Sequence, residues 1–102
     1  MRTLIISRTK DYYYTLPLEK QIELTQGAAA FIDKYRGAGK CRDAYFLPNL
    51  KGSVSIWETE SAEEGSRLFL ENPMTPFMDE EVMVVVEWDA GLRIMRETAT
   101  KY

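Results

Sequence analysis

Hydrophobic and polar residues follow a strand-like pattern in four segments of the chain. Residues 3–9 are rich in β-branched side chains, residues 41–48 have the composition of a strand, and residues 53–59 alternate with a period of two. Residues 81–88 form a near-continuous apolar run, which is typical of a strand covered on both faces. Because the turn-like residues 48–52 separate the second and third segments, we expect these two strands to form a hairpin.

Two other segments have the spacing of helices. Between residues 17 and 36, apolar side chains recur three or four positions apart, as on one side of a helix. A second helix of about ten residues is expected after Ser61, because Ser61 and Glu64 have the spacing of a capping box. This helix should end at Asn72, since Pro73 disfavours the helical conformation in the residue before it.

The elements therefore come in the order strand, helix, strand, strand, helix, strand. This is the ferredoxin-like, or split βαβ, arrangement, an α+β fold in which two helices cover one face of a four-stranded antiparallel sheet. The other face is left bare, and we expect it to hold Ile5, Ser7, Ser53, Ser55, Trp57, Met83, Val85 and Glu87. A face this apolar exceeds what a monomer usually exposes, which predicts a homodimer or a higher homo-oligomer packed through the sheets.

The length of 102 residues suits one domain, which we expect to occupy residues 1–88. Residues 89–102 form a C-terminal tail in which Leu92, Ile94 and Met95 lie among charged residues. Two interpretations of the tail stay open: a short helix that packs on the partner, or a frayed end.

Composition excludes several classes of function. The net charge is only -3, and acids and bases are interspersed, so the basic patch of a nucleic-acid-binding protein is missing. The longest apolar run, residues 82–86, is far shorter than the ~20 residues that span a bilayer. The first ten residues have an apolar core too short for a signal peptide, and the single cysteine, Cys41, cannot form an internal disulfide. We therefore expect a cytoplasmic protein without a nucleic-acid or membrane partner.

The chain contains no histidine, which is the commonest general base near pH 7 and the commonest metal ligand. Zinc sites and nucleophiles activated by histidine are therefore not expected. Any catalysis must use carboxylates, tyrosines, serines, lysine, arginine or backbone groups, and we expect it to need neither a metal nor another cofactor.

Pro73 and Pro76 form a Pro-x-x-Pro pattern, which in exposed segments can bind SH3-type grooves. Here the surrounding charges are all acidic and the segment is short, so we expect a joint between the second helix and the last strand. Seven positions of this joint resemble the corresponding joint of the muconolactone isomerase family: Pro73, Pro76, Phe77, Met78, Asp79, Glu81 and Val82.

The resemblance extends over roughly residues 2–88 and includes Gly39, Arg42 and the Ser53-Val54 pair. It implies a dimeric α+β barrel, in agreement with the order of elements. Members of that family carry histidines in the second and third strands, regions in which this chain has Asp43 and the Lys51-Gly52 turn.

An enzyme that moves a proton between carbons needs a base and a donor for the developing enolate oxygen. The candidate bases are Glu87, beside Val86 and Trp88, and Asp43, beside Ala44, because apolar surroundings raise the pKa of a carboxyl group. The alternative interpretation is that each is a solvated edge charge or part of an ion pair between subunits.

Three consecutive tyrosines, Tyr12 to Tyr14, follow the first strand. We expect at least one to pack on the core, while the hydroxyl of Tyr12 is the third catalytic candidate and Tyr14 could face a ligand. The other candidate substrate-binding residues are Arg8 and Tyr45 as donors, Ser55, Trp57 as an aromatic wall, and Pro76, Phe77 and Met78 as a pocket rim.

Three functions fit these residues. The resemblance implies a cofactor-free isomerase or cyclase that acts on a hydrophobic, cyclic or enolisable catabolic or secondary-metabolite intermediate. A cofactor-free monooxygenase of the antibiotic-biosynthesis type would share the fold and would consume oxygen. The third possibility is a ligand-binding or purely oligomerising domain, which the missing histidines and the small residues of the "GAAAF" stretch, 27–31, favour.

Overall fold

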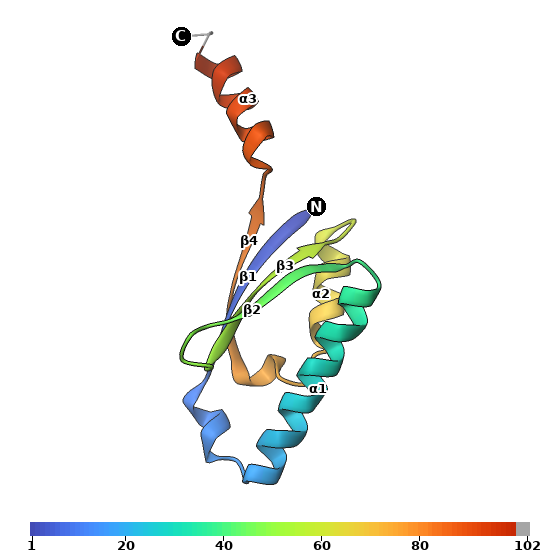
Figure 1. Cartoon of the computed structure of the whole chain (residues 1–102), viewed down its shortest axis with the longest axis vertical. Helices are drawn as coiled ribbons and strands as arrows, with labels where there is room; N and C mark the ends of the chain where they lie inside the picture. The colour runs from blue at the N-terminus through green and yellow to red at the C-terminus, as the bar shows by residue number, and fades with distance from the viewer. Residues whose placement is uncertain (100–102) are drawn as a thin grey trace.

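The computed structural model describes residues 1–99, which form an α+β fold around one four-stranded antiparallel sheet (Figure 1). The elements, in chain order, are β1 (Arg2–Thr9), the 3-10 helix η1 (Asp11–Thr15), α1 (Leu18–Gly37), β2 (Cys41–Phe46), β3 (Gly52–Glu58), α2 (Ala62–Leu70), the 3-10 helix η2 (Thr75–Phe77), β4 (Met78–Val85) and α3 (Trp88–Ala99). The strands lie side by side in the order β2-β3-β1-β4. The predicted ferredoxin-like α+β fold is confirmed.

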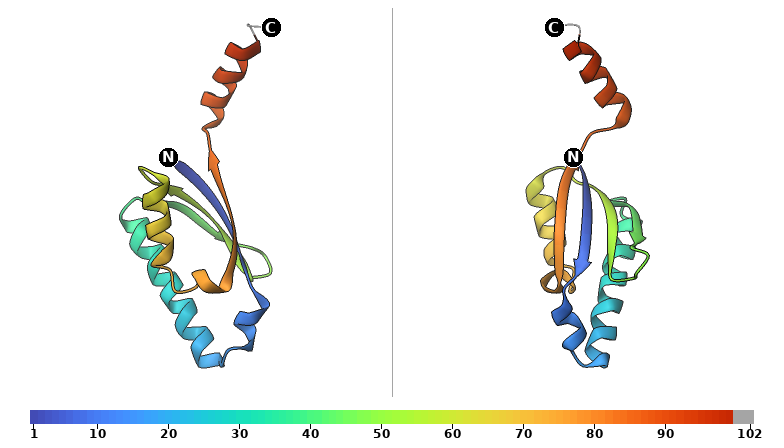
Figure 2. Two further views of the ribbon diagram at one scale, coloured as in Figure 1. Left: turned by 180° about the vertical axis from the view of Figure 1, so that it is seen from behind. Right: turned by 90° about the vertical axis from the view of Figure 1, so that its left-hand side faces the viewer.

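Two of the helices cover one face of the sheet. The views of Figure 2 show α1 and α2 on the same side of the strands, with the opposite face open. The third helix, α3, continues from the end of β4 and projects away from the sheet (Figure 1), so the molecule is elongated, with a longest extent of 59 Å. We call the two sides of the sheet the covered face and the bare face.

The core lies between the covered face and the helices. Ile5 of β1 and Trp57 of β3 are each only 1% exposed and pack with Phe31 and Tyr35 of α1. Our assignment of Ile5 and Trp57 to the bare face was therefore wrong. The period of two along a strand tells which residues share a face, but it does not tell which face the helices cover.

The bare face is formed by the alternate residues of the same strands. The register pairs Leu4 with Ile56 and Met83, and directly paired residues of antiparallel strands lie on the same side. The apolar residues of this face are Leu4, Ile6, Val54, Ile56, Met83 and Val85. Met83 and Val85 thus lie where the sequence predicted them, while Ser7, Ser53 and Ser55 lie on the covered face.

The last strand begins and ends earlier than predicted. β4 runs from Met78 to Val85, and its last residue pairs with Arg2, the first residue of β1. Val86 has no residue of β1 opposite it, so the apolar run continues past the end of the sheet and Trp88 opens α3. Of the two interpretations of the tail, the structure supports a helix, while residues 100–102 of the predicted tail lie outside the described residues. The division of the chain into residues 1–88 and 89–102 stays a prediction.

The Pro-x-x-Pro segment is a joint, as predicted. The Asn72 side chain accepts a hydrogen bond from the backbone N–H of Met74 (3.0 Å), and the Thr75 hydroxyl donates to the backbone of Phe69 (2.6 Å). Pro73 lies against α1 at Gly27, where an added Cβ would come within 2.7 Å of the proline ring. The joint is therefore held between α1 and the start of β4. Among the helices of residues 1–99, none combines the length and the apolarity needed to cross a membrane.

Candidate active site

A cavity of about 350 Å³ lies between α1 and the covered face of the sheet. Its walls hold small side chains where a packed core would have large ones: Ala28 and Ala29 of α1, Ala44 of β2, and Ser53 and Ser55 of β3. Protein interiors are otherwise close-packed, so this series of small residues is the physical reason that the space exists. The alanines of the 27–31 stretch therefore help to form the cavity.

The inner end of the cavity adjoins a smaller hollow of about 30 Å³. The two share several lining residues, among them Ser7, Ser53 and Ser55, and the hollow extends to Trp57 and Glu80. Serine hydroxyls, an indole ring and a carboxylate thus line this hollow. This is the arrangement expected of a ligand site, which is mostly apolar with a few convergent polar groups.

Glu80 is the carboxylate at this inner end. It pairs with Ser7 across β1 and β4, which places its side chain on the covered face with the cavity. Within residues 1–99 its carboxylate makes no hydrogen bond or ion pair, and desolvation by burial raises its pKa above the ordinary value for glutamate. A half-buried carboxylate without a partner costs stability, and groups of this kind concentrate at functional sites.

Ser55 is a buried hydroxyl of the site that has a hydrogen-bond partner within the protein. It is 6% exposed, and its Oγ accepts a hydrogen bond of 2.8 Å from Nε1 of Trp57. Because the indole N–H can only donate, the hydroxyl proton of Ser55 is free to be donated elsewhere. Ser55 is therefore suited to donate a hydrogen bond to a ligand oxygen in the cavity.

Four exposed apolar or aromatic residues of the lining mark the mouth of the cavity. These are Phe46 at 74%, Leu50 at 72%, Tyr45 at 61% and Tyr14 at 42%. They come from β2, from the β2–β3 loop and from η1, so the opening lies at the end of the molecule away from α3 (Figure 1). Large apolar and aromatic side chains thus surround the entrance.

The three consecutive tyrosines have three different environments. Tyr13 is 7% exposed and its hydroxyl donates to the backbone of Gln21 (2.9 Å), so one tyrosine packs on the core as predicted. Tyr14 lines the cavity. Tyr12 stacks on Phe77 with ring centroids 5.6 Å apart and does not line the cavity.

Two further charged residues line the outer part of the cavity, Asp33 and Arg36 on α1. They lie one helical turn apart and are both exposed. Across residues 1–99, no group of three or more cysteine, aspartate or glutamate side chains is placed to hold a metal ion. The cavity and its hollow together hold the Glu80 carboxylate, several hydroxyl donors and these two charged side chains.

Five of the predicted substrate-binding residues line the cavity or its inner hollow: Tyr14, Tyr45, Ser55, Trp57 and Met78. Three others do not. Arg8 pairs with Glu81 (2.6 Å) at the surface. Pro76 and Phe77 lie in η2, where Phe77 packs against the cluster around Tyr13.

The predicted catalytic residues lie away from the cavity. Glu87 follows the end of β4 and forms an ion pair with Arg2, and Asp43 lies opposite Ile56 on the bare face. Neither they nor Tyr12 are among the lining residues. Their catalytic roles stay a prediction from the sequence, whereas the geometry of the cavity favours Glu80.

Sequence reasoning missed Glu80, although a signal for it was available. In residues 80–84 the alternate positions Glu80, Val82 and Val84 share a face of the strand, and the register places that face opposite Ile5. A carboxylate that shares one face of a strand with apolar residues is a candidate for burial. The signal was obscured because the side that the helices cover could not be assigned from the pattern.

Comparisons with known proteins agree with this architecture. No protein-family model and no curated protein matches the chain. The crystal structure of muconolactone isomerase superposes with a TM-score of 0.73 and 19% sequence identity, over 85% of this chain and 90% of that one. The chain has the fold of muconolactone isomerase.

A second solved structure is similar over a comparable length. It is 5-chloro-2-hydroxyhydroquinone dehydrochlorinase from Burkholderia phenoliruptrix AC1100, in complex with 2,5-dihydroxybenzoquinone. Its TM-score is 0.70 at 16% identity, and the match covers 88% of this chain and 98% of that one. At these identities a shared fold does not carry a shared activity, which must be argued from the residues of the cavity.

Proposed function

We propose that this protein is a cofactor-free enzyme that transfers a proton on a hydrophobic, cyclic or enolisable small molecule, as an isomerase or cyclase. The observation that carries the proposal is the carboxylate of Glu80. It lines the small hollow that adjoins the mostly apolar cavity, it has no hydrogen-bond or ion-pair partner among residues 1–99, and burial raises its pKa. A carboxylate of raised pKa is a stronger base than an ordinary glutamate, and proton transfer is what such a group does well.

In this mechanism Glu80 takes a proton from a carbon next to a carbonyl group, which leaves an enolate and a neutral carboxyl group. The hydroxyl of Ser55, which accepts from Trp57, donates its own proton as a hydrogen bond to the enolate oxygen. Return of the proton from Glu80 to a different carbon gives the isomer. The step is balanced in atoms and charge, and it needs neither a metal nor an oxidant.

The size and lining of the cavity support a small cyclic substrate. A volume of about 350 Å³ is at the lower end of the range for ligand sites, and most of the wall is apolar. The structurally similar dehydrochlorinase binds a dihydroxybenzoquinone, a flat six-membered ring. We infer that this cavity takes a ring of comparable size that carries a carbonyl group.

We also propose that two copies of the chain associate through the bare face. Its apolar centre is flanked by ion pairs at both ends of β1, Arg2 with Glu58 (2.8 Å) and Arg8 with Glu81 (2.6 Å). A contiguous apolar patch with a charged border is typical of an interface between subunits. A homodimer of this kind leaves the cavity, on the covered face, free to bind its ligand.

The experiment compares wild-type protein with Glu80→Gln on α-angelica lactone, a small β,γ-unsaturated lactone, in D₂O. NMR measures both isomerisation and the exchange of carbon-bound hydrogen for deuterium. Glutamine keeps the shape of the side chain and cannot accept the proton. We expect kcat/KM to fall by about 10²–10⁴.

The matched control is Glu81→Gln, one position along the same strand, where the side chain points to the opposite face. This variant should keep its activity within about twofold of wild type, because an exposed ion pair contributes little to the stability of the fold. Equal activity of wild type and Glu80→Gln would contradict the assignment of the base. Oxygen uptake in place of isomerisation would favour the monooxygenase, and ligand binding without any exchange would favour a binding domain.

A further inference from the structure

A row of polar side chains crosses three strands at the inner end of the cavity. Ser53 of β3 pairs with Ser7 of β1, and Ser7 pairs with Glu80 of β4, so the three side chains lie next to one another on the covered face. All three line the small hollow that adjoins the cavity. Within residues 1–99 the two hydroxyls, like the carboxylate, make no hydrogen bond. Unused donors and acceptors therefore surround one small space.

Asn72, in the joint after α2, adds a donor to the same hollow. It is one of the lining residues. Its side-chain oxygen accepts a hydrogen bond of 3.0 Å from the backbone N–H of Met74, while its amide nitrogen makes no hydrogen bond to residues 1–99. The groups of this side chain that have no partner are therefore its two N–H donors.

The hollow has the size of one water molecule. Its volume of about 30 Å³ matches the share of one molecule in liquid water, and a buried water needs about two to four polar partners. The hollow offers a carboxylate that accepts, an amide that donates, and serine hydroxyls that do either. It is too small for a ring, and the N–H donors of Asn72 would oppose a cation. Water is the occupant that fits both the volume and the partners.

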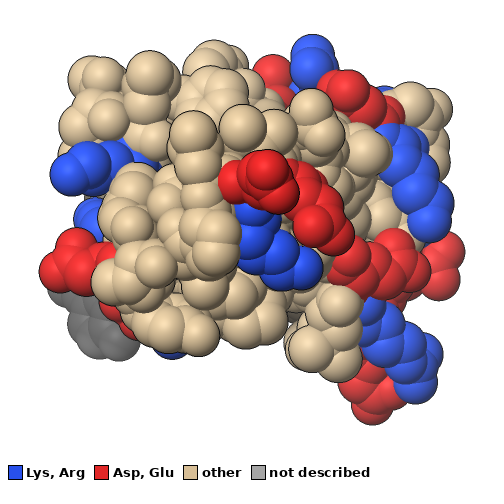
Figure 3. Space-filling view, turned by 90° about the horizontal axis from the view of Figure 1, so that it is seen from below, with Lys and Arg blue, Asp and Glu red and all other residues tan. Residues whose placement is uncertain are grey.

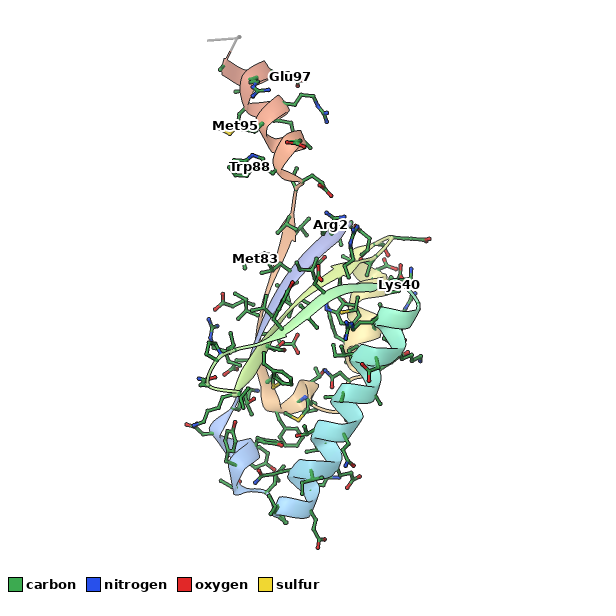
Figure 4. All side chains as sticks on the ribbon, viewed as in Figure 1. Arg2, Lys40, Met83, Trp88, Met95 and Glu97 are labelled. Carbon is green, nitrogen blue, oxygen red and sulfur yellow. The ribbon has the colours of Figure 1, made fainter. Side chains whose placement is uncertain are left out.

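The cations at the α3 end of the sheet are engaged by other carboxylates. Figure 4 shows Arg2 and Lys40 at that end. Arg2 pairs with Glu58 (2.8 Å) and Lys40 with Glu64 (2.6 Å). Glu80 is the third residue of β4, at the end of the strand away from α3. Its carboxylate therefore stays available to take a proton from a water molecule.

We propose that the hollow binds a water molecule as a second reactant, and that the site hydrolyses lactones, which are cyclic esters, in addition to isomerising them. This second activity rests on the proposed function for its ligand site and for Glu80 as the base. It goes beyond the proposed function because water, in place of a carbon atom of the substrate, loses the proton.

The hydrolytic step uses groups that line the hollow and the cavity. Glu80 takes a proton from the water while the water oxygen bonds to the acyl carbon of the lactone. The carbonyl electrons move to the carbonyl oxygen, which accepts a hydrogen bond from Ser55, a residue that lines both spaces. The ring C–O bond then breaks, and the leaving oxygen receives the proton from Glu80. One water is consumed for each ester opened, and no other reactant is needed.

The entrance suits an uncharged ester. Figure 3 shows the end of the molecule that carries η1 and the β2–β3 loop, where acidic and basic side chains are interspersed with uncharged surface. The mouth residues Phe46 and Leu50 are exposed and apolar. Because no single sign of charge gathers around the opening, a neutral lactone meets no electrostatic barrier there.

The test uses α-angelica lactone with wild-type protein in H₂¹⁸O, followed by NMR. Hydrolysis gives levulinate and isomerisation gives the conjugated lactone, so one spectrum measures both activities. We expect levulinate to form at least about a hundredfold faster with wild type than with Glu80→Gln. The ¹⁸O should appear in the carboxylate of levulinate, as an isotope shift of its ¹³C resonance, because the water adds to the acyl carbon. A carboxylate without the label overturns the proposal.

The variant Ser7→Val tests the hollow itself. Valine removes a hydroxyl partner of the water and fills its space, so hydrolysis should fall at least about tenfold more than isomerisation. The matched control is Thr3→Val, which exchanges a hydroxyl for a methyl group on the same face of β1 but outside the hollow and the cavity. There the ratio of the two activities should stay within about twofold of wild type. An unchanged ratio in Ser7→Val overturns the proposal.

A crystal structure of the protein without a ligand locates the water directly. We expect density in the hollow within about 3.2 Å of a Glu80 carboxylate oxygen and of a second polar atom. A hollow without density, in a map that shows other buried waters, overturns the proposal.

The two activities can fail separately. Absence of levulinate above the rate in buffer overturns the proposed hydrolysis, whether or not deuterium exchange in D₂O occurs. Exchange and isomerisation without levulinate leave the proposed isomerase standing. Levulinate without exchange supports hydrolysis and contradicts the isomerase.

Discussion

The Glu80 side chain should make the stability of the fold depend on pH in a direction opposite to that of most carboxylates. Burial raises its pKa in the folded state, so the neutral form is favoured there. The stabilising contribution is fully present below the unfolded pKa of about 4.3 and is lost as the pH rises through the folded pKa. We expect Glu80→Gln to have a higher Tm than wild type at pH 7, with a difference that shrinks toward pH 4.

The control for this effect is Glu81→Gln, which removes the same charge but also breaks the ion pair with Arg8. Thermal unfolding followed by circular dichroism between pH 4 and pH 8 should show no gain for this variant. A Tm of Glu80→Gln below that of wild type at pH 7 would show that the carboxylate has a stabilising partner. Higher stability together with lost proton transfer is the combination expected of a catalytic base.

At the residue scale, the sequence predicted the types of group in the site better than their positions. Ser55, Trp57 and Tyr14, three of the candidate substrate-binding residues, line the cavity or its hollow, and their contact with a ligand stays a prediction. Glu80 was missed and Ile5 was assigned to the wrong face. Both errors have one cause, since an apolar pattern on both faces of a sheet does not show which face the helices cover.

At the scale of the elements, the start of α2 depends on its cap. Ser61 Oγ accepts a hydrogen bond from the backbone N–H of Glu64 (3.2 Å), and the Glu64 side chain accepts from the N–H of Glu60 (2.9 Å). We expect Ser61→Ala to lower the free energy of unfolding by about 1 kcal/mol, measured by urea denaturation. Ser66→Ala, an exposed position inside the same helix, is the matched control and should have no effect or a slightly stabilising one. An equal loss in the two variants would show that the cap contributes nothing.

The elements themselves could be predicted because their signals are local. The capping box marked the start of α2, and Pro73 marked the joint, although α2 ends at Leu70, before Asn72. The end of β4 could not be predicted in the same way. Its apolar run continues to Val86, and only the position of the neighbouring strand β1, which begins at Arg2, determines where pairing stops.

At the scale of the whole molecule, the order of elements determined the ferredoxin-like topology, because few arrangements satisfy short, right-handed connections. The sequence pattern does not predict the direction of α3, which projects away from its own domain and leaves Trp88 79% exposed.

Association through the bare face predicts that a charge on it separates the subunits. Met83 lies on that face and is 43% exposed, so Met83→Asp should fold, yet it would bury an unpaired carboxylate in the interface. The next residue, Val84, is 64% exposed and points to the covered face, which makes Val84→Asp the matched control. In sedimentation velocity we expect the dimer dissociation constant of Met83→Asp to rise at least a hundredfold, because a buried charge without a partner costs about 3–5 kcal/mol. Val84→Asp should change this constant by less than about fivefold. A larger effect of Val84→Asp would move the interface to the covered side of β4, and a wild-type monomer at high concentration would leave the bare face without a partner copy.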